Sequence, residues 1–200
     1  MKTTRHQAGF TLVEMAIVVS IIALLISAVL GGQALLRSGQ TQDIIATAKD
    51  LSAAVQVFKQ RYRYLPGDFP VDQEIPDVSA ACRFGGGGAV DGDGQISSAE
   101  STCAAEHLIR AGITRGDPAT GFITRFGAVR LIAANDASVK VTGFPASVLN
   151  LVEMANIPCD VAVDIVRKLD VGDLQAQGAR VRASIASCTS GNVLFLGFAL

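Results

Sequence analysis

Residues 9–36 have the sequence GFTLVEMAIVVSIIALLISAVLGGQALL, and this stretch decides the fold expected for the start of the chain. The 22 residues from Met15 to Leu36 carry no charge. A helix needs roughly 20 such residues to cross the hydrocarbon core of a bilayer, and a helix satisfies its own backbone hydrogen bonds there. The stretch therefore predicts a membrane-spanning helix.

The charges around this helix predict its orientation. Lys2 and Arg5 precede it without any acid, which favours an N-terminus in the cytoplasm and export of the rest of the chain. An ordinary secretory signal peptide is the competing interpretation, with a weak cleavage site at 32–34. The long uncharged run argues against it, as does Glu14, because a carboxylate at that depth needs a partner and indicates a functional site.

The six residues from Gly9 to Glu14 resemble the processing site of type IV prepilins and type II secretion pseudopilins. The resemblance implies that prepilin peptidase removes the leader 1–9 after Gly9 and that the new N-terminal residue, Phe10, is N-methylated. It also implies that Glu14 is a subunit-assembly residue. A neighbouring subunit's Phe10 amine would pair with the Glu14 carboxylate, and each charge would offset the other's desolvation.

The resemblance extends to location and partners. It implies a single-pass protein of the bacterial inner membrane, with residues 37–200 forming a periplasmic pilin-like head after the assembly helix 10–36. The expected partners are other pilin or pseudopilin subunits, prepilin peptidase, the inner-membrane assembly machinery and membrane lipid.

The helical pattern continues past the apolar run. Apolar residues recur at spacings of three and four, which predicts one helical face buried against the head: Ile44, Ala48, Leu51, Val55, Phe58 and Tyr62. The helix should end near Tyr64, because Pro66 and Gly67 follow.

The C-terminal half predicts an α+β fold. Segments rich in Val, Ile, Phe and Thr indicate a four-stranded antiparallel sheet packed on the outer half of the long helix. The expected strands are 121–133, 138–144, 179–187 and 192–199, and the expected helices are 106–111, 146–156 and 159–169.

The composition excludes several classes of protein. Half of the residues are hydrophobic and the net charge is −1, so the chain is neither disordered nor basic enough to indicate nucleic-acid binding. There is no Gly-x-Ser-x-Gly sequence, and the glycines at 85–88 lack the ending of a phosphate-binding loop. We therefore expect that the protein is not an enzyme.

Four cysteines follow the predicted span, where an oxidising compartment favours disulfides. Three pairings are open, and we favour Cys82–Cys103 and Cys159–Cys188 because each closes a loop within one local unit. No Cys-x-x-Cys spacing occurs, so we expect no zinc site. His107 is expected at the surface of a short helix.

The acidic segment 91–100 resembles part of an EF-hand calcium loop. Aligned to that loop, Asp91, Asp93 and Glu100 take positions three, five and twelve, and Gln95 takes position seven through its carbonyl. Ala89 stands at position one, so one carboxylate is missing. A solvated turn held by the first disulfide is the equal alternative, and the chain is expected to require no cofactor other than this optional Ca²⁺.

Two functions fit these observations. The first is a structural pilin-like subunit that polymerises through its N-terminal helices into a type IV pilus or a type II secretion pseudopilus. The alternative is a membrane-anchored or secreted calcium-binding module that does not polymerise.

Overall fold

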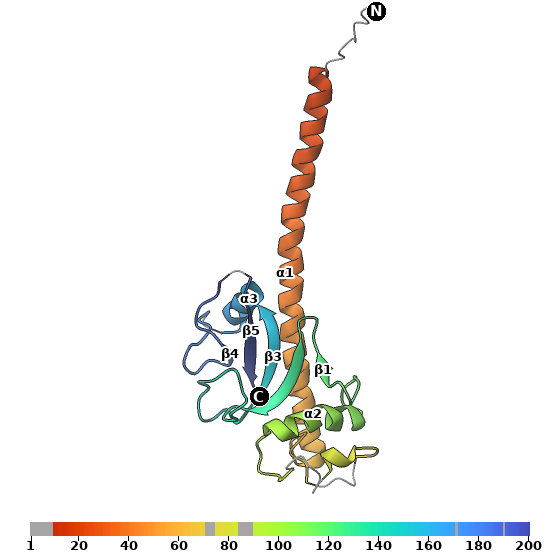
Figure 1. The fold of residues 1–200 in the computed structure, drawn as a ribbon, viewed down its shortest axis with the longest axis vertical. Coiled ribbons are helices and arrows are strands. Elements are labelled where there is room, and N and C mark those ends of the chain that lie inside the picture. Colours follow the sequence, from red (N-terminus) through yellow and green to blue (C-terminus); the bar gives the residue numbers. More distant parts are fainter. Residues whose placement is uncertain (1–9, 71–74, 84–89, 171, 190) are drawn as a thin grey trace, which may run out of the picture. The chain divides into compact units, whose positions relative to one another are not determined.

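The computed structural model describes residues 10–70, 75–83, 90–170, 172–189 and 191–200 (Figure 1). The expected leader 1–9, with Gly9, and position one of the acidic loop, Ala89, lie outside the described residues. The chain divides into two compact units, Met1–Gln40 and Thr41–Leu200, and the second is called the globular unit below.

Helix α1 (Leu12–Tyr62) runs through both units. It ends where the sequence predicts, since Arg63 takes a left-handed φ of 70° and Pro66 follows three residues later. Within the globular unit, the predicted apolar face of α1 is buried and packs into the main core; Ile44 and Phe58 are fully inaccessible to solvent.

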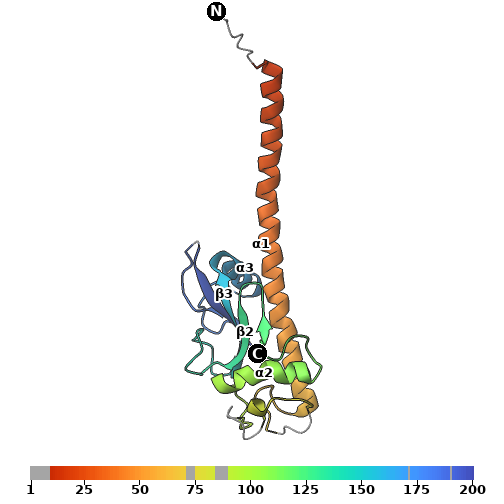
Figure 2. The same ribbon diagram turned by 45° about the vertical axis from the view of Figure 1, so that its right-hand side comes forward.

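The sheet has five antiparallel strands in the order β1-β2-β3-β5-β4, which confirms the α+β fold class. The strands are β1 (Phe122–Ile123), β2 (Ala128–Ala133), β3 (Asn150–Pro158), β4 (Val181–Ala183) and β5 (Val193–Ala199). Figure 2 shows the outer part of α1 running along the sheet, and their apolar side chains share one core.

Besides α1, the described residues of the globular unit form three helical segments: the short 3-10 turn η1 (Ala80–Cys82), α2 (Ser98–Arg110) and α3 (Cys159–Leu169). The helix predicted over 159–169 is confirmed. The short helix predicted over 106–111 is the end of the longer α2, whose start is set by a Ser97 capping box.

The helix predicted over 146–156 is wrong, because this segment supplies the central strand β3. Both faces of β3 are covered, and five consecutive residues from Asn150 to Met154 are buried. A strand buried on both faces loses its alternating pattern, so periodicity cannot distinguish it from a buried helix.

The strand predicted over 138–144 is also wrong. Its backbone N–H groups at Lys140 and Val141 donate to the Glu153 side chain, at 2.6 and 3.2 Å, so the segment is a loop lying on the sheet. The strand predicted over 121–133 is instead the β1–β2 hairpin, closed by Thr124 and Gly127 at 2.8 Å. These differences give five strands rather than four.

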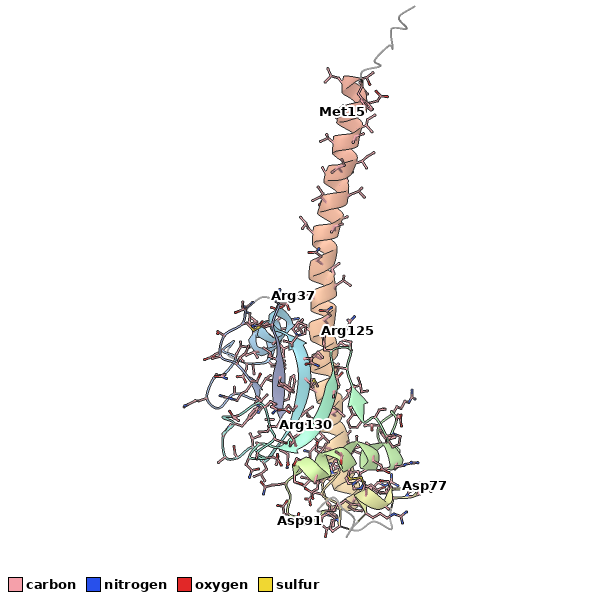
Figure 3. The ribbon with its side chains drawn as sticks, viewed as in Figure 1. Met15, Arg37, Asp77, Asp91, Arg125 and Arg130 are labelled. Atoms are coloured by element: carbon pink, nitrogen blue, oxygen red, sulfur yellow. A yellow bond between two sulfur atoms is a disulfide. The ribbon has the colours of Figure 1, made fainter. Side chains whose placement is uncertain are left out.

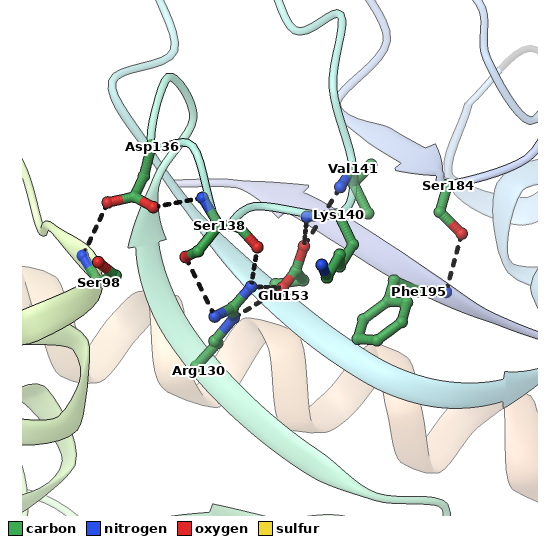
Figure 4. A network of polar contacts seen from close by, with 9 residues as sticks. All are labelled: Ser98, Arg130, Asp136, Ser138, Lys140, Val141, Glu153, Ser184 and Phe195. Carbon is green, nitrogen blue, oxygen red and sulfur yellow. Dashed lines mark hydrogen bonds and ion pairs between the residues drawn. The ribbon is translucent and has the colours of Figure 1, made fainter.

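Figure 4 shows the polar contacts that hold the loop 138–144 on the sheet. Arg130 on β2 and Glu153 on β3 form an ion pair at 2.5 Å, and Glu153 is 1% exposed. Arg130 also donates to the Ser138 carbonyl at 2.8 Å. The buried carboxylate thus has an opposite charge and two backbone donors as partners, which offsets the cost of burying it.

The structure contains the two disulfides favoured from the sequence. Cys82–Cys103 joins η1 to α2, and Cys159–Cys188 joins the start of α3 to the segment after β4. Each bridge therefore closes a loop within the globular unit.

Candidate functional site

The first candidate site is the N-terminal turn of α1. Thr11 lies directly before the helix, and its hydroxyl accepts a hydrogen bond from the Glu14 backbone N–H at 3.2 Å. In return, Oε2 of Glu14 accepts from the Thr11 backbone N–H at 2.9 Å and from its hydroxyl at 2.8 Å. This reciprocal arrangement is a capping box, which satisfies N–H groups at the helix start.

Helix α1 then exposes its apolar side chains. Figure 3 shows Met15 projecting from the helix, and Met15 is 51% exposed. Leu12 and Leu24 are 90% and 72% exposed. By length and hydropathy α1 can cross a membrane, and its most apolar window has a mean hydropathy of 2.7 and no buried residues. A continuous exposed apolar surface of this kind requires lipid or another apolar partner.

The second candidate site is the acidic loop. Backbone N–H groups of Asp93 and Gln95 donate to the carboxylates of Asp91 and Asp93, at 3.2 and 2.7 Å. Gly92 and Gly94 both have positive φ, 76° and 86°, which glycine adopts without strain. The loop therefore turns tightly and presents its carboxylates on one side.

The sequence analysis missed Asp68, which the fold brings to this loop from the turn after α1. Its two carboxylate oxygens accept from the N–H groups of Gly92 and Gly94, at 2.5 and 2.7 Å. Oxygen atoms of Asp68, Asp91 and Asp93 all lie within 4.8 Å of one another. No local pattern signals this contact, because Asp91 lies 23 positions after Asp68 in the sequence.

The sheet holds the acidic loop in place. Oδ1 of Asn150 accepts from the Ile96 N–H at 2.8 Å, and its amide donates to the Gly94 carbonyl at 2.9 Å. The Asp136 carboxylate accepts from the Ser98 N–H at 2.8 Å, as Figure 4 shows. The loop and the first turn of α2 are thus fixed to the ends of β2 and β3.

Glu100 lies in the first turn of α2 and is 2% exposed. Its Oε2 accepts from the Ser97 N–H at 2.8 Å, completing the capping box, and the Asp91 backbone N–H is a further donor to this carboxylate. Burial raises the pKa of Glu100, and the charge of Asp91 adds to the effect. Burial likewise raises the pKa of Asp68 to about 6, with Glu100 and Asp93 contributing.

The four residues predicted to bind a metal ion are therefore placed as follows. Asp91, Asp93, Gln95 and Glu100 line one surface hollow of about 300 Å³. The Gln95 side-chain amide donates to Asp93 at 3.5 Å. The donor set is rich in carboxylates, and this chemistry fits a hard divalent cation such as Ca²⁺.

The prediction of a surface position for His107 is wrong. The imidazole is 1% exposed; its Nδ1 accepts from the Gly67 N–H at 3.0 Å, so Nε2 carries the proton and donates to the Cys82 carbonyl at 3.0 Å. Burial lowers its pKa. His107 is thus a neutral structural link between the turn after α1, η1 and α2.

Comparison with known proteins identifies the N-terminal segment. Residues 4–30 match the family model for the prokaryotic N-terminal methylation motif, the signature of type IV pilins and pseudopilins. No curated protein and no solved structure matches the chain. The matched segment contains Phe10, Thr11 and Glu14 and most of the exposed apolar part of α1.

Proposed function

We propose that this chain is a structural subunit that polymerises through its N-terminal helices into a type IV pilus or a type II secretion pseudopilus. One observation carries the proposal: the methylation motif continues directly into an exposed apolar helix whose first turn contains Glu14. The motif is that of a pilin-type precursor, and it implies processing by prepilin peptidase. The proposal assigns no catalytic activity to the chain.

Processing would take place at the membrane. Cleavage after Gly9 would create a charged amine on Phe10, which methylation would retain. The basic leader would keep this end in the cytoplasm, and the globular unit with its two disulfides would lie in the periplasm. The methylation motif and the apolar helix support an anchor in the inner membrane.

The geometry of Glu14 supports a role in assembly. Both hydrogen bonds from Thr11 end on Oε2. Oε1 can therefore accept from the Phe10 amine of an adjacent subunit while the cap of its own helix stays in place. This pairing would bring two opposite charges together in an apolar bundle of helices, where an unpaired charge is costly.

The substitution Glu14→Gln tests the assembly role. Glutamine retains a carbonyl oxygen for the cap but removes the attraction to the amine. We expect normal levels of the variant in membranes and loss of the variant from sheared filaments when it is expressed without wild type. Asp43→Asn is the matched control, because Asp43 is an exposed acid elsewhere on α1 and its substitution should leave incorporation unchanged.

Two other outcomes would reject parts of the proposal. Filaments formed by Glu14→Gln alone at wild-type levels would refute the pairing. A processed, membrane-bound wild-type chain that forms no filament with its partner subunits would favour the alternative function, an anchored cation-binding module. The carboxylates at Asp68, Asp91 and Asp93 support that alternative, although a filament subunit can also carry them.

A further inference from the structure

We propose that the globular unit pairs with a second copy of this chain through a groove between α1 and the connection from α2 to β1. A two-fold axis would relate the two copies, so that Asp50 of each copy meets Arg115 of the other. Such a pair is closed and adds no third copy, which distinguishes it from the head-to-tail contacts that extend a filament.

The groove has a volume of about 490 Å³ and lies within the globular unit. One wall is α1 from Thr47 to Val57, and the other wall is formed by residues 113–115 and by Phe122 of β1, which Figure 1 shows beside α1. About three turns of the helix line the first wall, so the groove follows α1.

The groove presents apolar surface to solvent. Val57 on α1 is 48% exposed, and Ile113 and Phe122 on the facing wall are only half-buried. Leu51 and Ala54 are buried beneath them. A second copy seated on the groove would remove this apolar surface from water, which favours association.

Two opposite charges mark the two walls. Asp50 lies on α1 and Arg115 on the facing wall; both are exposed, and neither has a hydrogen-bond or ion-pair partner among the described residues. A two-fold axis along the groove would place the α1 wall of each copy opposite the 113–115 wall of the other. Each acid would then meet a base, so this face is its own electrostatic complement.

A buried hydroxyl is an independent sign of a missing partner. Oγ1 of Thr114 is inaccessible to solvent and has no hydrogen-bond partner among the described residues, which is costly for a buried polar atom. Thr114 lines the groove directly before Arg115. Rotation about χ1 turns the hydroxyl toward the groove, where Asp50 of the second copy would accept from both Thr114 and Arg115.

The two-fold arrangement suits two chains anchored in one membrane. Because the groove follows α1, an axis along the groove keeps the two copies of this helix parallel. A shared membrane also raises the effective concentration of one chain around the other. The pair can therefore form although each exposed ion pair contributes little on its own.

Sedimentation of the full-length chain in detergent tests the proposal. The chain carries Glu14→Gln, which removes polymerisation as a source of association, so the result does not depend on whether the chain forms filaments. We expect a monomer–dimer equilibrium that salt shifts toward monomer, because the charge pairs are close to solvent. A monomer at every protein concentration would overturn the proposal.

Charge reversal tests the pairing of Asp50 with Arg115. In Asp50→Arg and in Arg115→Asp, like charges would face each other across the two-fold axis, and we expect each variant to dimerise at least about tenfold more weakly. A mixture of the two variants should restore the dimer, because each wall of one chain then meets the opposite charge on the other chain.

Three results would contradict this pairing. Either variant could dimerise like the parent chain, or the mixture could remain monomeric. The mixture could also form assemblies larger than a dimer, which would show a head-to-tail contact and refute the two-fold axis.

Lys49→Asp is the matched control. Lys49 is exposed beside Asp50 and its reversal changes the net charge as much as Arg115→Asp does, but Lys49 lines a different hollow, with Leu169 and Phe198. We expect this variant to dimerise like the parent chain. An equal loss in Lys49→Asp and Arg115→Asp would show a general effect of charge and would contradict a specific face.

The substitution Thr114→Val tests the buried hydroxyl. Valine keeps the shape of threonine but removes the unpaired oxygen, so we expect a weaker dimer without a fall in the Tm of the monomer. A fall in Tm with unchanged dimerisation would show that the hydroxyl already has a partner within one chain and would contradict its role in the contact.

Discussion

The substitution Asn150→Ala should strongly destabilise the globular unit, because it removes the side chain that fixes the acidic loop to the sheet. Asn150 is 7% exposed and joins β3 to Ile96 and Gly94 through two hydrogen bonds of 2.8 and 2.9 Å. Alanine can replace neither bond. The substitution leaves the backbone donor of Ile96 and the backbone acceptor of Gly94 without their partners.

The expected magnitude follows from the surroundings of these two groups. Ile96 is fully inaccessible, so its orphaned N–H costs about 2 kcal/mol, within the usual range for a buried unsatisfied donor. Gly94 is half-buried and its carbonyl can reach water, so this loss costs about 1 kcal/mol. The sum of about 3 kcal/mol corresponds to a fall in Tm of roughly 6–12 °C for a unit of this size.

Differential scanning calorimetry of the full chain in detergent measures this change. Asn135→Ala is the matched control: Asn135 borders the hollow beside the acidic loop but is exposed, so its loss should change stability by less than about 0.5 kcal/mol. A fall in Tm for Asn150→Ala no larger than for Asn135→Ala would refute the claim that the sheet anchors the loop.

Three further predictions concern the rest of the globular unit. Non-reducing peptide mapping should recover only the two described disulfides. Arg130→Met should lower the free energy of unfolding by about 2–3 kcal/mol in denaturant titrations, because it leaves the buried Glu153 carboxylate without its opposite charge. The loss is below that of a fully buried pair because the Arg130 side chain is 33% exposed. The contribution of His107 to stability should fall as the pH drops below about 6.5, because burial lowers the pKa of His107 in the folded chain and the unfolded chain then binds the proton more tightly.

Each of these predictions has its own control. A disulfide between any other pair of the four cysteines would contradict the packing of η1 on α2. Adding Glu153→Gln to Arg130→Met should restore most of the lost stability, since glutamine keeps an acceptor for the loop without a charge; no recovery would contradict the charge argument. Between pH 7 and 5, the stability of His107→Gln should fall less, or rise more, than that of wild type. The comparison isolates His107 because Asp68 and Glu100, whose raised pKa values act in the opposite direction, are present in both chains.

The sequence predicted the features that depend on local pattern. The apolar run, the end of α1 before Pro66 and the buried face from Ile44 to Tyr62 follow from hydropathy, proline geometry and helical period. Helix α3 follows from the same period. These features need no knowledge of which distant segments pair.

The features that escaped prediction depend on tertiary contacts. The segment 150–158 is a strand because neighbouring strands and helices cover both of its faces, and its own periodicity does not reveal that. Asp68 joins the acidic loop, and His107 becomes buried, only after the turn behind α1 packs on α2. Two missed features have a local signal: the Thr11–Glu14 and Ser97–Glu100 capping boxes, which the patterns Thr-x-x-Glu and Ser-x-x-Glu would have indicated.

The N-terminus of the chain recovered from sheared filaments tests the central claim most directly. Intact-mass measurement and N-terminal sequencing should find a chain that begins at Phe10 and carries one additional methyl group on its amine. Recovery of a chain that begins at Met1, or one cut within 32–35, would contradict the processing step and with it the account of this protein as a polymerising pilin-like subunit.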